Sequence, residues 1–177
     1  MSDNKPADQQ RQMTTEEAAE FAEQVFNKAR EGDAAMLAAL MSKGLPPNLR
    51  NHKGDTLLML ASYHGHVDAV KVLLEHKADP EIRNDNGQSP IAGAAFKGDL
   101  EMVKTLIEGG AQVEGASFDG RTALMMAAMF NRTEIIKYLV SKGADPKAKD
   151  ANGITALDAA KTMGANDSIA LLNELLG

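Results

Sequence analysis

The residues with the widest range of possible chemistry are the four histidines, which all lie between residues 52 and 76. Three or four converging imidazoles could hold a zinc ion, and one imidazole beside a serine and an acid could serve as a general base. The densest part of this stretch, Tyr63-His64-Gly65-His66, ends an apolar run. The first question is whether YHGH is a chemical site or the end of a helix.

The elements that must carry the histidines argue against a shared site. The pattern places His52 in a turn, His64 at the exposed end of one helix, His66 in the turn that follows and His76 at the far end of a second helix. We therefore expect the four rings to point apart, and we predict neither a catalytic site nor a metal site. A histidine-based metal site, in which His52 and His64 share a ligand with Asp55, is the alternative that remains open.

Other routes to catalysis are equally weak. The chain has no cysteine, which excludes thiolate zinc sites and a cysteine nucleophile. Ser62 and Ser89 have no histidine and acid arranged around them, and no glycine-rich phosphate-binding motif occurs. We predict that the protein is not an enzyme and uses no cofactor.

Charge and composition exclude further classes of function. A net charge of -6 and a pI near 5.2 argue against nucleic acid, which binds basic surfaces. No apolar run is long enough to span a membrane, and the first residues, MSDNKPADQQRQM, lack the apolar core of a signal peptide. We expect a cytoplasmic protein, although a periplasmic or secreted chain from which a signal has been removed would read the same.

The elements themselves are revealed by an internal repeat of 33 residues. Four registers keep this step, and they comprise Gly54, Gly87, Gly120 and Gly153; Thr56, Ser89, Thr122 and Thr155; Ala61, Ala94, Ala127 and Ala160; and Leu73, Leu106, Leu139 and Leu172. A further series runs Gly32, Gly65, Gly98, Asn131 and Gly164. Agreement in so many registers predicts a stack of similar units.

Residues 84–116 illustrate the unit. Asp-Asn-Gly predicts a tight turn, Ser89 is placed to cap a helix with Pro90 at its first position, and Gly98 ends that helix. Apolar residues from Leu100 to Ile107 recur at helical spacing and predict a second helix. The unit is therefore a turn, two helices and a loop.

These units resemble the ankyrin repeat family, whose pattern is matched by GDTLLMLASYHGH (54–66), GQSPIAGAAFKGD (87–99), GRTALMMAAMFNR (120–132) and GITALDAA (153–160). The resemblance implies an all-α solenoid of stacked helix-turn-helix units with turn or hairpin fingers, capped at both ends, and a structural role for His66. One departure is systematic, because the histidine of the family's first helix is replaced by Met59, Ala92, Met125 and Asp158.

The resemblance divides the chain into six segments: a disordered tail (1–13), an N-terminal degenerate capping repeat (14–50), three ankyrin repeats (51–83, 84–116 and 117–149) and a C-terminal capping repeat (150–177). Thr14 and Glu17 have the spacing of a capping box at the start of the first helix. The predicted buried stripe of that helix comprises Ala18, Phe21, Ala22, Val25, Phe26 and Ala29. Leucines near the C-terminus, at positions 171, 172, 175 and 176, could leave an apolar edge.

The family's concave surface is lined by the ends of the first helices and by the turns. The predicted binding residues on the helices are Tyr63, His64, Phe96, Lys97, Met129 and Phe130, and those in the turns are His52, Lys53, Asp55, Asp85, Asn86, Gln88, Phe118, Asp119 and Arg121. Four of the seven aromatic residues fall in this set, whereas Phe21, Phe26 and Tyr138 are expected in the core. Clustered aromatic residues are typical anchors of protein interfaces, although some rings could instead fold back onto a neighbouring repeat.

We therefore predict a protein–protein interaction module that binds a partner protein through its concave face, as an adaptor, a scaffold or an inhibitor. An accessory subunit that stabilises or localises a partner enzyme, such as a redox enzyme, is the alternative. We expect a monomer with no nucleic-acid or membrane partner, and a dimer through the C-terminal leucines is the other possibility.

Overall fold

The computed structural model describes residues 11–177, which form ten α-helices. In chain order these are α1 (Thr15–Glu31), α2 (Ala34–Ser42), α3 (Leu57–Tyr63), α4 (Val67–Glu75), α5 (Pro90–Lys97), α6 (Leu100–Glu108), α7 (Ala123–Met129), α8 (Thr133–Ser141), α9 (Ala156–Met163) and α10 (Asn166–Leu176). The described residues form no strand beyond the isolated bridges Arg50–Thr56 and Ala116–Thr122. The expected all-α solenoid is confirmed. Most of the tail that we expected to be disordered, residues 1–10, lies outside the described residues.

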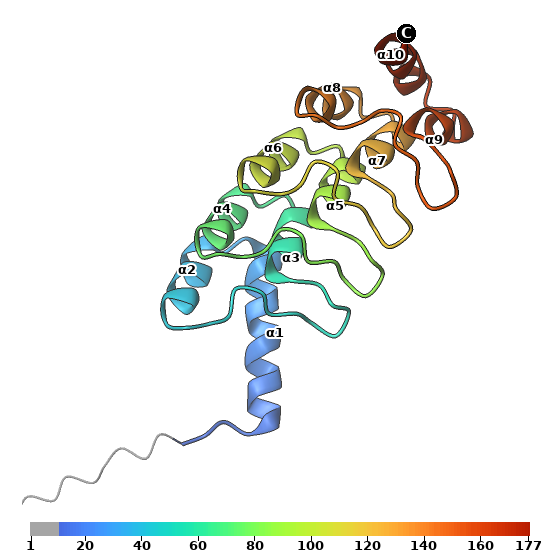
Figure 1. The fold of residues 1–177 in the computed structure, drawn as a ribbon. Coiled ribbons are helices and arrows are strands. Elements are labelled where there is room, and N and C mark those ends of the chain that lie inside the picture. The colour runs from blue at the N-terminus through green and yellow to red at the C-terminus, as the bar shows by residue number, and fades with distance from the viewer. Residues whose placement is uncertain (1–10) are drawn as a thin grey trace, which may run out of the picture.

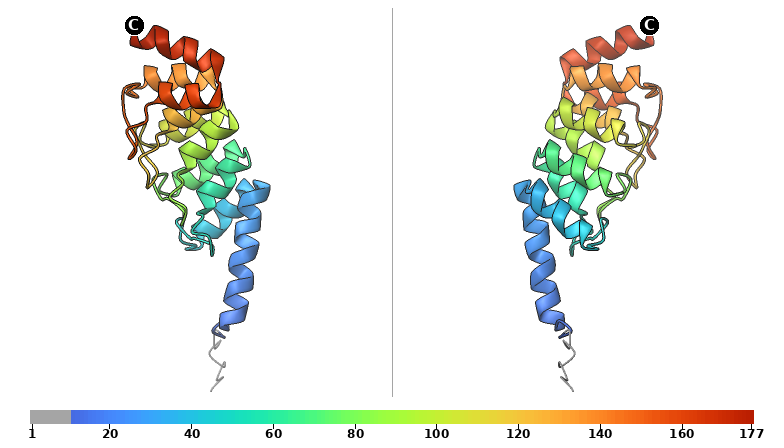
Figure 2. Two further views of the ribbon diagram at one scale, coloured as in Figure 1. Left: turned by 90° about the vertical axis from the view of Figure 1, so that its right-hand side faces the viewer. Right: turned by 90° about the vertical axis from the view of Figure 1, so that its left-hand side faces the viewer.

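Consecutive helices pair, and the pairs stack into a solenoid (Figure 1). The helices α1, α3, α5, α7 and α9 form an inner row, and α2, α4, α6, α8 and α10 form an outer row, because each helix packs against the next member of its own row. The loops that precede α3, α5, α7 and α9 extend along one edge of the stack (Figure 2), and we call these loops the fingers. This arrangement places the ends of the inner helices and the fingers on adjoining surfaces.

The inner helices begin at hydroxyl caps, as their sequences predict. Thr56, Ser89, Thr122 and Thr155 each accept a hydrogen bond from the backbone N–H three residues later, at 3.1 to 3.3 Å. The first helix has a complete capping box, because Glu17 N–H donates to Thr14 Oγ1 and Thr14 N–H donates to the Glu17 carboxylate. These contacts satisfy donors that helix formation leaves free and so fix where each helix starts.

Asn131 shows how the stack tolerates a departure from the glycine series. Its φ is +60°, a left-handed conformation that asparagine adopts more readily than most residues. The side chain also bridges to the next helix pair, since Nδ2 donates to Asp167 at 3.0 Å and Oδ1 accepts from Ser168 N–H at 2.9 Å. Asparagine at this position therefore lacks the conformational freedom of glycine but adds a contact between repeats.

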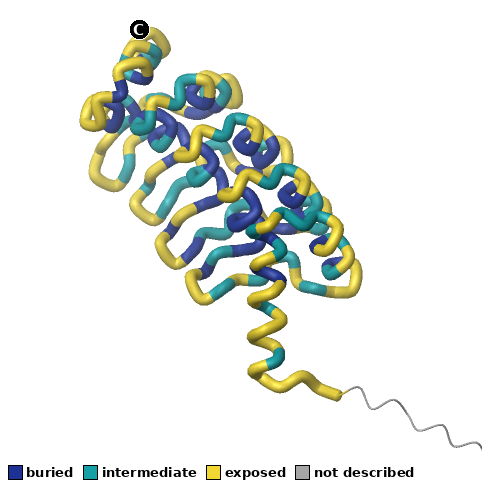
Figure 3. The backbone as a smooth tube through the Cα atoms, turned by 180° about the vertical axis from the view of Figure 1, so that it is seen from behind, coloured by how far each residue is buried: buried dark blue, intermediate teal, exposed yellow. Residues whose placement is uncertain are grey.

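The core runs between the two rows of helices (Figure 3), and its buried side chains are mainly leucine, isoleucine, valine, alanine and methionine. The prediction for α1 is wrong in its first half, because Ala18 is exposed and Phe21 keeps 40% of its surface exposed. The first half of α1 extends beyond the stack (Figures 1 and 2), so only its second half, with Val25, Phe26 and Ala29, reaches the core.

The two remaining apolar predictions have mixed outcomes. Tyr138 is half-buried against the core, and its enclosed hydroxyl has no hydrogen-bond partner among residues 11–177. At the C-terminus, Leu172 is fully buried and Leu171 and Leu176 are half-buried, whereas Leu175 remains 40% exposed. The apolar edge considered for this end is therefore limited to one exposed leucine.

Candidate functional site

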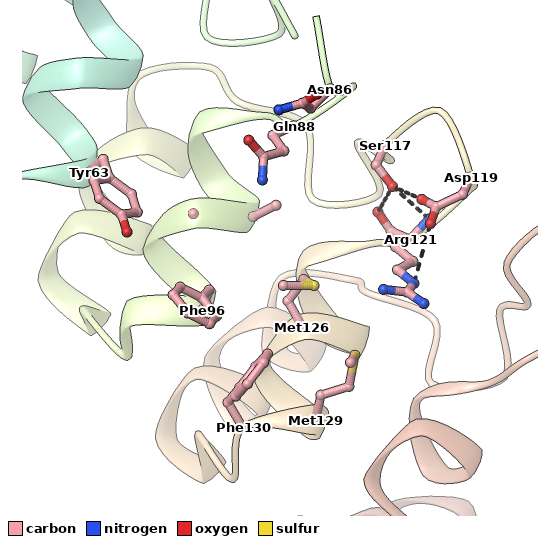
Figure 4. A pocket seen from close by; sticks show the side chains of 12 residues that line it. Tyr63, Asn86, Gln88, Phe96, Ser117, Asp119, Arg121, Met126, Met129 and Phe130 are labelled. Atoms are coloured by element: carbon pink, nitrogen blue, oxygen red, sulfur yellow. Dashed lines mark hydrogen bonds and ion pairs between the residues drawn. The ribbon is translucent and has the colours of Figure 1, made fainter. Parts of the chain in front are cut away.

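Three of the four predicted aromatic residues meet at a hollow of about 430 Å³ on the inner row of helices (Figure 4). Tyr63 at the end of α3 and Phe96 near the end of α5 keep 44% and 38% of their surface exposed. Met129 and Phe130, at the end of α7, are half-buried and complete the lower wall with Met126. The structure therefore brings together four predicted residues from three successive repeats.

The polar wall of the hollow comes from the fingers. Asn86 and Gln88 precede α5, and Asp119 and Arg121 precede α7 (Figure 4). All four were predicted as binding residues. Their exposed amide, carboxylate and guanidinium groups leave hydrogen-bonding capacity beside an apolar cavity, which is the usual composition of a specific binding site.

Some of the aromatic rings make contacts within the protein. Phe96 and Phe130 pack edge to face, with ring centroids 4.7 Å apart and an angle of 88°. Lys97 Nζ lies 4.3 Å from the centroid of the Tyr63 ring, in the range of a cation–π contact. The folding back that we considered for these rings is greatest for the half-buried Phe130, whereas Tyr63 and Phe96 remain exposed despite these contacts.

An ionic cluster fixes the finger before α7. Arg121 Nε lies 3.4 Å from the Asp119 carboxylate and 3.9 Å from that of Asp150 in the next finger. The Ser117 hydroxyl donates to Asp119, and this bond, followed by the charge of Arg121, holds the pKa of Asp119 below its usual value. Asp119 therefore remains ionised well into the acid range and keeps Arg121 in place.

The other predicted finger residues differ in whether their side chains are bonded within the protein. Asp55 is half-buried and accepts a hydrogen bond from Asn84 at 2.9 Å, so it holds two fingers together. Asp85 pairs with Arg50 at 3.5 Å. His52 and Lys53 are exposed, and their role in binding stays a prediction.

Phe118 lies at the tip of its finger, away from the hollow. It is 69% exposed, and its ring covers Gly87 in the preceding finger, with Arg83 5.7 Å from the ring centroid. The residue therefore contributes to packing between fingers, and its contact with a partner also stays a prediction.

The histidines are not arranged as a group of ligands. His66 Nε2 is 2.7 Å from the Arg30 carbonyl oxygen, and His76 Nδ1 is 2.9 Å from that of Val72. His64 and His66 do not point apart as expected, because their rings stack with centroids 6.5 Å apart. Within residues 11–177, no three histidine or carboxylate side chains are placed to hold a metal ion.

The charge around His64 is positive. Burial, followed by the charges of His66, Lys97 and Arg30, lowers the pKa of His64 below 6.5. Among these groups, Lys97 lies nearest the hollow, because its ammonium group stacks on the Tyr63 ring.

Two small residues at the hollow, Ala92 and Gly93, were missed as site residues by the sequence analysis. Both lie on α5 beneath the aromatic side chains. The signal was present in the repeat alignment, because the equivalent positions hold Met59 and Leu60 in the preceding repeat and Met125 and Met126 in the following one. A cavity that arises from missing side chains is easily overlooked when a search looks for reactive groups.

None of the helices in the described part of the chain combines the length and the apolar composition needed to cross a bilayer.

Comparison with known proteins agrees with the architecture. The family model described as ankyrin repeats (3 copies) matches residues 25–117 and 93–175. An ankyrin repeat protein of Pseudomonas aeruginosa is similar to this chain, with 61% identity over 56 residues, which cover 32% of this chain and 33% of that protein. The match thus spans about a third of that relative's length.

Proposed function

The chain belongs to the ankyrin repeat family, and from this premise we propose that it binds a partner protein through its concave surface. Ankyrin repeats are general protein–protein interaction modules, and the proteins that carry them are typically not enzymes. The binding surface is formed by the predicted repeats 51–83, 84–116 and 117–149. Its centre is the hollow bounded by Tyr63, Phe96 and Phe130.

The observation that carries this proposal is the exposure of aromatic side chains around a preformed cavity. Tyr63 and Phe96 leave 44% and 38% of their surface in water, beside a hollow of about 430 Å³. Exposed apolar surface that gathers in one place marks interaction sites on soluble proteins. Because both rings stand on helices fixed by the stack, little conformational entropy is lost when they bind.

Lysate capture followed by mass spectrometry tests the proposal. The native chain is compared with Tyr63→Ala and Phe96→Ala, and Phe21→Ala is the matched control because Phe21 has a similar exposure, 40%, but lies on the protruding half of α1. Each concave variant should weaken a captured complex by about 1 kcal/mol or more, which is at least about a fivefold rise in Kd. Phe21→Ala should leave that Kd unchanged.

The three variants also separate a binding role from a packing role. Circular dichroism melting should show Tyr63→Ala close to native, whereas Phe96→Ala also loses the edge contact with Phe130, worth about 0.5–1.5 kcal/mol. A partner that binds native and concave variants equally would move the site away from this surface. Once a partner has been identified, an adaptor and an inhibitor are distinguished by whether binding changes the activity of that partner.

A further inference from the structure

Gly93, a glycine inside a helix, lines the hollow beside Ala92 and leaves part of it open. Gly93 lies within α5, whereas the same position holds Leu60 in α3 and Met126 in α7. Because Gly93 lines the hollow together with Tyr63, Met126 and Phe130, a side chain of either kind at residue 93 would extend into it. The middle repeat therefore differs from its two neighbours at this position of the hollow.

Neither the backbone nor the packing requires glycine at this position. Gly93 does not have a positive φ, and a Cβ added there would lie 3.7 Å from Tyr63 Cδ2, an ordinary van der Waals contact. Glycine in a helix interior costs about 0.5–1 kcal/mol relative to alanine. The middle repeat thus has a residue that disfavours its own helix and leaves an open apolar hollow.

The size and walls of the hollow suit a bulky apolar side chain. Its volume of about 430 Å³ lies toward the lower end of the range of about 300–1,000 Å³ for ligand pockets. Phe96, Met126, Met129 and Phe130 offer aromatic and thioether surfaces. Methionine side chains adapt to different shapes, so these walls can close around an aromatic or an aliphatic group.

Lys97 places one positive charge beside Tyr63 at the side of the hollow. Lys97 stacks on the Tyr63 ring, and within residues 11–177 no carboxylate lies at ion-pair distance from its ammonium group. His64 lies beside Tyr63, with ring centroids 5.6 Å apart. The acid that faces the hollow, Asp119, is already paired with Arg121 and bonded to Ser117.

We propose that the concave site recognises a segment of a partner protein in which a bulky apolar side chain, seated above Gly93, lies close to an aspartate or glutamate that pairs with Lys97. This inference rests on the proposed function and specifies the chemistry of the partner. Charge complementarity selects the acidic neighbour, and the missing side chain at residue 93 selects the apolar one. Gly93 is then a specificity-determining residue.

Selection from a phage library of random peptides, each a dozen residues long, tests the proposal. The baits are the full chain and its variants Gly93→Met, which restores the residue type of the next repeat, and Lys97→Glu. Lys71→Glu is the matched charge control, because Lys71 is an exposed lysine on outer helix α4. Melting curves establish that each bait is folded, and Gly93→Ala supplies a smaller filling change if Gly93→Met does not fold.

The native chain and Lys71→Glu should both enrich peptides with Asp or Glu within a few residues of Phe, Trp, Leu or Met. Fluorescence polarisation of one such peptide should show at least a tenfold loss of affinity for Gly93→Met, or a smaller loss for Gly93→Ala. Lys97→Glu should no longer select acidic peptides. Peptides without this composition, or equal binding to native and filled variants, would overturn the inference while leaving recognition by the concave surface intact.

Two further outcomes would also overturn it. If the native chain enriches no peptide, a short linear segment is the wrong class of ligand, and the proposed function is then decided by the lysate capture alone. The other outcome involves α1, whose exposed Phe21 lies beside Glu17 and Glu20 and meets the same chemical description. Self-association that both Phe21→Ala and Gly93→Met abolish in analytical ultracentrifugation would make the occupant a second copy of this chain.

Discussion

Replacing Gly87 by alanine measures how closely neighbouring fingers pack. Gly87 has φ +75°, a left-handed conformation that costs an L-residue about 1–2 kcal/mol. An added Cβ would also lie 2.6 Å from Cγ and 3.0 Å from Cβ of Phe118, so the Phe118 side chain would have to move. Gly153 holds the same place in the last repeat, with φ +76°, but no heavy atom lies within 4 Å of an added Cβ.

This pair of glycines separates the backbone cost from the packing cost. We expect Gly153→Ala to lower the free energy of unfolding by about 1 kcal/mol and Gly87→Ala to lower it by about 2 kcal/mol. The additional cost is limited to about 1 kcal/mol because Phe118, at 69% exposure, can turn into solvent. Urea unfolding followed by circular dichroism measures these differences.

A double-mutant cycle then tests the explanation directly. Phe118→Ala removes the obstacle, so Gly87→Ala in that background should cost only about 1 kcal/mol. Because terminal repeats can unfold before the rest, Gly65→Ala in the repeat 51–83 is a second reference, with φ +78° and a nearest atom at 3.7 Å. A coupling energy between Gly87 and Phe118 below about 0.5 kcal/mol, the scatter seen for independent sites, would refute the packing argument.

Gly93→Ala should raise the free energy of unfolding by about 0.5–1 kcal/mol in the same urea assay, since it removes a glycine from the interior of α5 without a clash, and a destabilised variant would contradict the account of the hollow. Because burial and neighbouring cations lower the pKa of His64 below 6.5, the native state resists its protonation, so stability present above about pH 6.5 is lost as the pH falls through the lowered pKa. His64→Gln should therefore lose less melting temperature than the native chain between about pH 7.5 and pH 5, and equal losses would contradict this sign. Ser168→Ala should leave stability unchanged or raise it slightly, because the fully buried Ser168 hydroxyl has no hydrogen-bond partner within the described residues, and a loss above about 1 kcal/mol would indicate a missed partner.

The fold could be predicted from sequence because its determinants are local and repeated. A hydroxyl residue two positions after a turn glycine starts each inner helix after α1, and the structure shows the predicted cap at Thr56, Ser89, Thr122 and Thr155. The exposure of the first half of α1 could not be predicted in the same way. Its apolar stripe continues through Phe21, but burial depends on whether a neighbouring helix extends as far, and no residue within α1 encodes that.

The sequence predicted which residues lie at the candidate site, but it did not predict their side-chain contacts or the hollow between them. The repeat register located Tyr63 and Phe96 on the inner surface, since equivalent positions point the same way in every unit. Whether rings contact each other or solvent depends on side-chain conformations across repeats, as in the edge contact between Phe96 and Phe130. The hollow depends on the small residues Ala92 and Gly93, which carry no chemical signature of their own.

The protruding half of α1 presents a helix–coil problem within a folded protein. A short isolated helix is unstable in water mainly because its first turn must form without support. Here the turns around Val25 and Ala29 are held by the core, so the exposed half only has to extend an existing helix residue by residue. Its amide protons should therefore exchange in a gradient, fastest near Thr15 and slowest near Ala29, while the stack exchanges cooperatively. The helical part of α1 should thus shorten gradually as the temperature rises, before the repeats unfold.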